Sequence, residues 1–127
     1  MAMSERDAAG LDAEDNKLLV LARGALGRTG GASGAAVRDT DGRTYAAGEV
    51  ALKALRLTAL QSAVAAAMSS GAEGFEAAVV VGAQLRDPGV AAVQEVSSTA
   101  RIIFADRKGA IYDTVEDGFG ARSEVVE

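Results

Sequence analysis

Few side chains in this sequence could perform chemistry. Its 127 residues include neither cysteine nor histidine, which excludes disulfides, thiol nucleophiles, imidazole bases and zinc sites built from Cys and His. A metal would have to be bound through oxygen atoms alone, and such ligands favour Mg²⁺ or Ca²⁺. An enzyme without cysteine or histidine would depend on residues such as Asp39, Asp41, Glu49 and Ser62.

Each of these four residues also has a plain structural explanation. Asp39 and Asp41 stand in "DTDG", which is typical of a tight hairpin turn. Together with Gly42 they partly match a calcium-binding loop, but the later ligands of that loop are missing, which favours the turn. Glu49 is expected to be an exposed residue at a strand end, and Ser62 a residue in the first turn of a helix.

Charge and hydropathy limit the partners of the chain. The formal net charge is −5, and an acidic surface repels phosphate backbones, so we do not expect nucleic-acid binding. No apolar run reaches the length of about 18 residues that a membrane-spanning helix needs. The N-terminal "MAMSERDAAG" is polar and lacks the apolar core of a secretory signal. We therefore expect a cytoplasmic protein without a membrane partner.

Hydrophobic patterns predict one domain of helices and short strands. Continuous apolar runs such as "FEAAVVVGA" are typical of strands covered on both faces. The predicted elements are a helix at 12–27, a hairpin at 33–50, a helix at 58–70, a strand at 75–83, a helix at 86–98 and strands at 100–106 and 109–115. Helices alternating with such strands predict an α/β sheet with helices on both faces. The domain is expected to span 12–120, with tails at 1–11 and 121–127.

Capping signals predict where the helices begin and end. Asp12 is expected to be the N-cap of the first helix, and Gly27 its end. The segment "TALQ", which begins at Thr58, has the spacing of a capping box. Asp87 is expected to be the N-cap of the third helix, with Pro88 as its first helical residue.

Three segments share the outline of motifs from a known family. "SGAAV" at 33–37 is similar to a family pattern V-G-A-A-L, which also precedes a hairpin. "AGEVALKALRLTALQSAVA" at 47–65 matches G-C-N-x-E-N-A-S-Y-G-L-T-x-C-A-E-R-T-A in length without a gap, and "PGVAAVQ" at 88–94 matches P-C-G-A-C-R-Q. On these motifs, the chain resembles the cytidine deaminase superfamily over most of 12–120. The resemblance implies a three-layer α/β/α fold with a mixed five-stranded sheet and helices on both faces.

The same resemblance implies that the functional positions of the family are vacated. In the family, three cysteines bind zinc and a glutamate shuttles protons. An Asn and a Glu hold the ribose, and a Phe lines the nucleoside pocket. The residues of this chain at these positions are Leu60, Gly89 and Ala92 for zinc, Ser62 for the catalytic glutamate, Glu49 and Ala51 for the ribose, and Gly31 for the phenylalanine.

Zinc-dependent deamination requires a metal-bound hydroxide and a carboxylate that moves protons. The resemblance therefore implies a non-catalytic relative, a pseudoenzyme without metal or cofactor that has a structural or protein-interaction role. We expect Leu60 and Ala92 to fill the zinc position with carbon. We also expect Leu60 to be buried and structural.

Two other functions stay open. A small-ligand binding module could hold an anion or nucleotide in a relict pocket, because the starts of helices 58–70 and 88–98 should point toward one spot. A zinc-independent hydrolase could use the acidic residues and the serine named above.

The resemblance also bears on assembly, because cytidine deaminases of this size form tetramers. We expect a homo-oligomer, a tetramer rather than a dimer. Helix 58–70 and the C-terminal segment around Phe119 should lie near the interface. An unknown protein partner is a further possibility.

Overall fold

The computed structural model describes residues 11–82 and 87–116. Along this part of the chain the elements are α1 (Ala13–Thr29), β1 (Gly34–Asp39), β2 (Thr44–Gly48), β3 (Val50–Ala51), β4 (Arg56–Leu57), α2 (Ala59–Ser69), β5 (Phe75–Val81), α3 (Gly89–Val96), β6 (Arg101–Ala105) and β7 (Ile111–Val115). Of the expected tails 1–11 and 121–127, all but Leu11 lies outside the described residues, and Leu11 is buried in the core beneath α1. Phe119 and 83–86, where the third helix was expected to begin, also lie outside the described residues.

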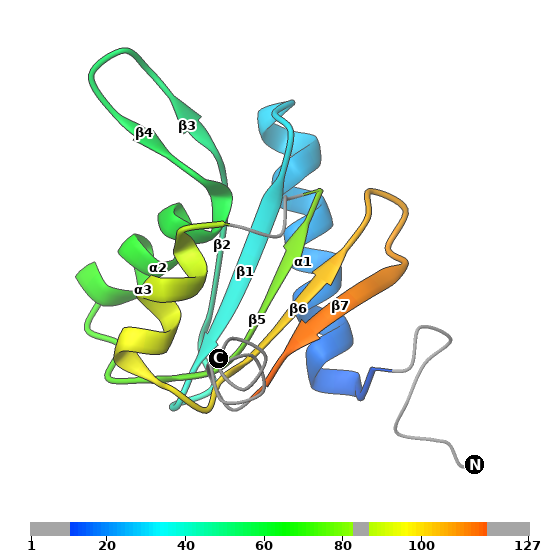
Figure 1. Ribbon diagram of the computed structural model, residues 1–127, viewed down its shortest axis with the longest axis vertical. Helices are drawn as coiled ribbons and strands as arrows, with labels where there is room; N and C mark the ends of the chain where they lie inside the picture. The colour runs from blue at the N-terminus through cyan, green and yellow to red at the C-terminus, as the bar shows by residue number, and fades with distance from the viewer. Residues whose placement is uncertain (1–10, 83–86, 117–127) are drawn as a thin grey trace, which may run out of the picture.

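The main sheet has five strands in the order β2-β1-β5-β6-β7. Only β5 and β6 run parallel, and the other neighbouring pairs are antiparallel. Figure 1 shows α1 on one face of this sheet and α2 and α3 on the other. The predicted mixed sheet between two helical layers is therefore confirmed.

Alternate residues of β5 supply two separate cores, because successive side chains of a strand point to opposite faces. Val79 and Val81 pack in the core beneath α1. Ala78 and Val80 pack in the core beneath α2 and α3, which also contains Leu60. Both cores are fully covered, which explains why the strand is a continuous apolar run and not an alternating one.

Helix α1 begins as predicted but extends past its predicted end. The Asp12 carboxylate accepts a hydrogen bond from Asp15 N at 2.8 Å, as expected of an N-cap. The helix continues to Thr29, and Gly30 ends it with a φ of 68°. Gly27 thus lies inside the helix, and its prediction as the end was wrong. An interior glycine costs only about 1 kcal/mol relative to alanine, which is too little to stop a well-packed helix.

Asp39 organises the turn between β1 and β2. Its carboxylate accepts hydrogen bonds from the backbone N–H groups of Asp41 and Arg43 and from the Tyr45 hydroxyl. Burial alone would raise the pKa of Asp39, but these hydrogen bonds and the Arg43 charge lower it below its usual value. The turn interpretation of "DTDG" is confirmed.

Residues 50–57 form a small hairpin, here called the arm, that the sequence patterns did not predict. Strands β3 and β4 pair over two residues each, and Figure 1 shows the arm projecting away from the sheet beyond the start of α2. Leu52 and Leu55 are exposed on it, Leu52 to 59%. Such short strands carry no periodic pattern, and no Gly, Pro or Asn marks the turn, so the usual signals of a hairpin are missing.

A buried ion-pair network joins α1 to the strands, and sequence reasoning missed it. Asp15 is buried, and its carboxylate accepts hydrogen bonds from the guanidinium groups of Arg38, at 3.0 Å, and Arg101. Arg38 also donates to Glu76 at 2.7 Å. Burial lowers the pKa of Arg38, but its bonds to Glu76 and Asp15 raise it overall, so its charge is held. A buried charge is retained only when it is paired in this way.

Within 11–82 and 87–116, no helix is both long enough and apolar enough to cross a bilayer.

Candidate functional site

The start of helix α2 is held by a capping box. Thr58 Oγ1 accepts from the backbone N–H of Gln61 at 3.1 Å, and the Gln61 side chain accepts from Thr58 N at 2.9 Å. This confirms the prediction for "TALQ". The reciprocal bonds satisfy two backbone donors that the first turn of a helix leaves free. They also fix the position of Leu60, which lies between Thr58 and Gln61 in the sequence.

The start of α3 is tied directly to the start of α2 through Asp87. This residue is buried, and its Oδ1 accepts from Gly89 N at 2.7 Å and from the Thr58 hydroxyl at 2.8 Å. The helix begins at Gly89, with Pro88 as its cap position, so Pro88 precedes the helix and is not its first residue as predicted. Asp87 still performs the capping expected of it, because its carboxylate binds the first helical N–H.

We call the place where these two helix starts meet, formed by Thr58, Leu60, Asp87 and Gly89, the α2/α3 junction. Helix N-termini carry partial positive charge. The Asp87 carboxylate supplies the negative charge at this junction from the chain itself. Sequence reasoning found the capping role of Asp87 but not its bond to Thr58, because no local spacing links the two residues.

Leu60 and Gly89 are in direct contact at the junction. Leu60 is fully buried, with 0% of its surface exposed, as predicted. A Cβ atom at Gly89 would lie 2.7 Å from both Cβ and Cγ of Leu60 and 2.9 Å from Gln61 N. Real Cβ atoms do not approach this closely, so the backbone of α3 lies against the Leu60 side chain and only a glycine fits without movement.

Ala92 and Ser62 lie on the same pair of helices. Ala92, one turn along α3, is half-buried and packs against the core that contains Leu60. The Ser62 hydroxyl is buried and has no hydrogen-bond partner in the described part of the chain. A buried hydroxyl without a partner weakens a fold.

Glu49 follows the end of β2 and binds the backbone of the loop between α1 and β1. Its Oε1 accepts from Ala32 N at 2.7 Å, and a Cβ atom at Gly31 would lie 2.8 Å from the same oxygen. The carboxylate therefore occupies the space that a side chain at position 31 would need. Ala51, in contrast, is exposed on the arm.

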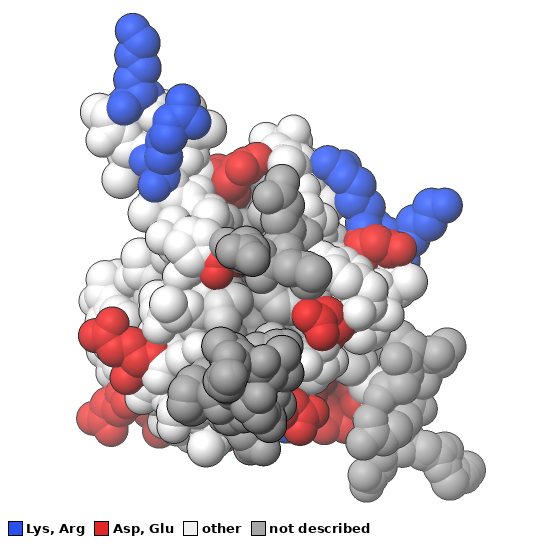
Figure 2. All heavy atoms as spheres, in the orientation of Figure 1, with Lys and Arg blue, Asp and Glu red and all other residues white. Residues whose placement is uncertain are grey.

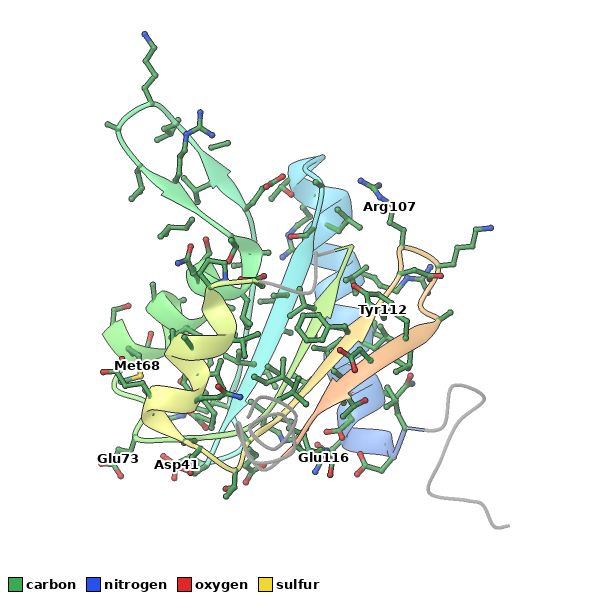
Figure 3. All side chains as sticks on the ribbon, viewed as in Figure 1. Asp41, Met68, Glu73, Arg107, Tyr112 and Glu116 are labelled. Carbon is green, nitrogen blue, oxygen red and sulfur yellow. The ribbon has the colours of Figure 1, made fainter. Side chains whose placement is uncertain are left out.

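The acidic residues considered as catalytic candidates do not converge. Strand register pairs Gly34 with Gly48 at one end of the β1–β2 hairpin, next to Glu49, whereas Asp39 and Asp41 form the turn at the other end. Figure 3 shows Asp41 at the lower edge of the molecule, away from the arm. Among the residues with a described position, no group of three or more His, Cys, Asp or Glu side chains could hold a metal ion.

Comparison with known proteins places this geometry in a family. The family model described as cytidine deaminase-like matches residues 11–109. The solved cytidine deaminase of Burkholderia pseudomallei superposes with a TM-score of 0.68 at 20% identity, over 80% of this chain and 91% of that one.

Two mycobacterial structures are similar as well. A point mutant of the Mycobacterium tuberculosis cytidine deaminase has a TM-score of 0.60 at 22% identity, over 73% of this chain and 85% of that one. The Mycobacterium leprae enzyme has a TM-score of 0.60 at 17% identity, over 91% and 98%. No curated protein matches the sequence. Sequence identities this low show only that the fold is shared. The match to the family model shows family membership. The chain belongs to the cytidine deaminase-like family.

Proposed function

We propose that this chain is a non-catalytic member of the family, a pseudoenzyme with a structural or protein-interaction role. The observation that supports this best is the contact between Leu60 and Gly89. In the proposal, the α2/α3 junction is the former zinc site. Leu60, Gly89 and Ala92 stand for the lost thiolates, and Ser62 stands for the lost carboxylate.

The spacing at the junction argues against any bound metal between these positions. Two cysteines joined by a disulfide have Cβ atoms about 3.5–4.5 Å apart, and a metal between two thiolates would need them to be further apart. Here a Cβ atom at Gly89 would come within 2.7 Å of Leu60 Cβ. The helices lie closer than a pair of zinc-binding cysteines would allow, so the backbone fits packing and not coordination.

The chemistry of deamination argues the same way. Zinc lowers the pKa of its bound water from far above neutrality to about 7, which makes hydroxide available at neutral pH. A serine hydroxyl at position 62 cannot take the place of the carboxylate that transfers protons in zinc deaminases. Without the thiolates and the glutamate, the carboxylate that remains at the α2/α3 junction is that of Asp87, and its Oδ1 already accepts hydrogen bonds from Gly89 N and from the Thr58 hydroxyl.

The relict-pocket alternative is weaker for three reasons. Leu60 fills the junction with carbon, and Asp87 already provides the anion that two helix starts would attract. Glu49, at the position that would have to contact the ribose, is instead bonded to Ala32 N. An anion or nucleotide entering here would have to displace the chain's own carboxylate.

A deamination assay tests the proposal. Purified protein, incubated with cytidine and deoxycytidine in zinc-containing buffer, should form uridine or deoxyuridine at the buffer rate. The Burkholderia pseudomallei enzyme serves as the positive control. Product formation that scales with protein concentration, and that Leu60→Glu abolishes, would overturn the proposal.

Assembly into a homo-oligomer is part of the proposal. Large apolar side chains remain exposed on and beside α2, namely Leu52 and Leu55 of the arm and Met68. Contact with other copies through this side would cover them, and a small domain gains stability by doing so. Light scattering at micromolar concentration should give a tetramer. A dimer would reject the tetramer alone, and a monomer would reject assembly altogether.

A further inference from the structure

A hollow of about 680 Å³ lies along α1, on the face of the sheet opposite the α2/α3 junction. We call it the α1 hollow. Arg23, Gly24 and Gly27 line it from the helix, Gly31 from the loop that follows, and Arg107 from the β6–β7 turn. Its size lies within the range of about 300–1,000 Å³ typical of small-molecule sites.

Two guanidinium groups from distant parts of the sequence meet at this hollow. Arg107 Nη2 lies 3.4 Å from the Gly31 carbonyl oxygen, and Figure 3 shows the Arg107 side chain extending from its turn toward the C-terminal end of α1. The Arg23 guanidinium lies over the same turn, because a Cβ atom at Gly109 would be 3.2 Å from its Nη1.

Neither arginine forms an ion pair with an acidic residue in the part of the chain that the structure describes. The four ion pairs among the described residues all involve other groups. Arginine stays charged at any ordinary pH and presents a planar set of donors that matches carboxylate and phosphate. In a chain with a net charge of −5, two uncompensated cations at one hollow are a local exception. Figure 2 shows the blue of Lys and Arg at the β6–β7 turn and at the tip of the arm.

Two of the glycines that line the hollow, Gly24 and Gly27, are not required by the packing of the described residues. A Cβ atom at Gly27 would meet nothing within 4 Å, and one at Gly24 would meet only Arg28 Nη1, at 3.5 Å. Each costs about 1 kcal/mol relative to alanine inside a helix. Their effect on the structure is to keep the helix surface open beneath the two arginines.

We propose that the α1 hollow binds a small organic anion. A phosphate or carboxylate group would accept hydrogen bonds from Arg23 and Arg107 at once. The rest of the ligand would lie on the glycines and on Val20, which is 60% exposed. The site does not depend on whether the α2/α3 junction has lost its chemistry.

A second copy of the chain fits the hollow less well. In a two-fold contact the same surface meets itself, so each copy would bring Arg23 and Arg107 toward the same groups of its partner. Like charges would then be buried together, which costs energy unless acids intervene. A small anion neutralises the same arginines without that cost.

Titration calorimetry at fixed ionic strength tests the proposal, with pyrophosphate and citrate as probes of the phosphate and carboxylate classes. Binding of either probe should weaken at least tenfold in Arg23→Gln and in Arg107→Gln. Lys53→Gln, which removes the same charge from the arm, should leave it unchanged. Gly27→Leu should fill the hollow and abolish binding while circular dichroism shows an intact fold.

Three results would overturn the proposal. One is the absence of heat with both probes. Another is equal weakening in Lys53→Gln, which would indicate only a general charge effect. The third is a fall in oligomer mass on Gly27→Leu without any loss of anion binding, which would assign the hollow to a second copy.

Discussion

The two faces of the sheet differ in whether their positive groups are neutralised and in whether the space beside the helices is filled. At the α2/α3 junction, two helix starts that would attract an anion are satisfied by Asp87, and the space is filled by Leu60 against Gly89. Along α1, two arginines have no acidic partner among the described residues, and Gly24 and Gly27 leave the helix surface open. Two helix starts that meet therefore need not leave a pocket between them, and a ligand can be sought on the opposite face of the sheet.

The largest expected effect on stability comes from truncating the Leu60 side chain at the α2/α3 junction. Leu60→Ala should lower the free energy of unfolding by about 2–5 kcal/mol, because a fully buried leucine leaves a cavity that its surroundings only partly close. Chemical denaturation measures this loss, with the exposed Leu52→Ala as the matched control. Equal, small losses in both variants would mean that an open pocket lies beside Leu60.

Gly89→Ala tests the contact from the opposite helix. The added Cβ would collide with Leu60, and overpacking of this kind costs about 1–3 kcal/mol. In a double-mutant cycle, the loss caused by Gly89→Ala should be smaller when Leu60→Ala is already present, because one of the two colliding Leu60 atoms, Cγ, is gone while Cβ remains. Strictly additive losses would contradict the predicted contact between the Leu60 side chain beyond Cβ and position 89.

Asp87→Ala should lower the free energy of unfolding by about 1–2 kcal/mol, the usual contribution of an N-cap. The substitution also removes the acceptor of the Thr58 hydroxyl. The exposed Glu73→Ala provides a matched loss of one acidic charge. If removing Asp87 instead stabilised the protein in the presence of pyrophosphate, the junction would be an anion site that Asp87 merely covers.

The smallest effects on stability are expected at the C-terminal end of α1. Gly27→Ala should stabilise the protein by about 1 kcal/mol, because helix propensity rises and the new methyl group meets nothing. Gly30→Ala should destabilise it by about 1–2 kcal/mol, because Gly30 has a left-handed φ. Thermal unfolding distinguishes the two. Destabilisation by Gly27→Ala would show that the glycine is required by the fold.

Local patterns predicted the features that depend on neighbouring residues. The capping box at Thr58, the N-cap at Asp12 and the turn at Asp39 all follow from spacings of a few positions. The central place of β5 follows from its unbroken apolar run. In each case the information lies within one segment, so the sequence suffices.

Features that depend on tertiary placement were not predicted. The bond from Thr58 to Asp87 and the meeting of Arg23 with Arg107 join segments that only the folded sheet brings together. The arm was missed because two-residue strands have no periodicity. The end of α1 was misplaced because an interior glycine and a terminal one look alike until the backbone conformation is known.

Metal content tests the central claim most directly. Protein produced in zinc-supplemented medium and desalted should contain far less than one zinc ion per chain by elemental analysis, because in the proposed function Leu60 and Gly89 take the positions of two zinc-binding cysteines. One zinc ion per chain, retained after desalting and lost in Leu60→Asp, would contradict the account.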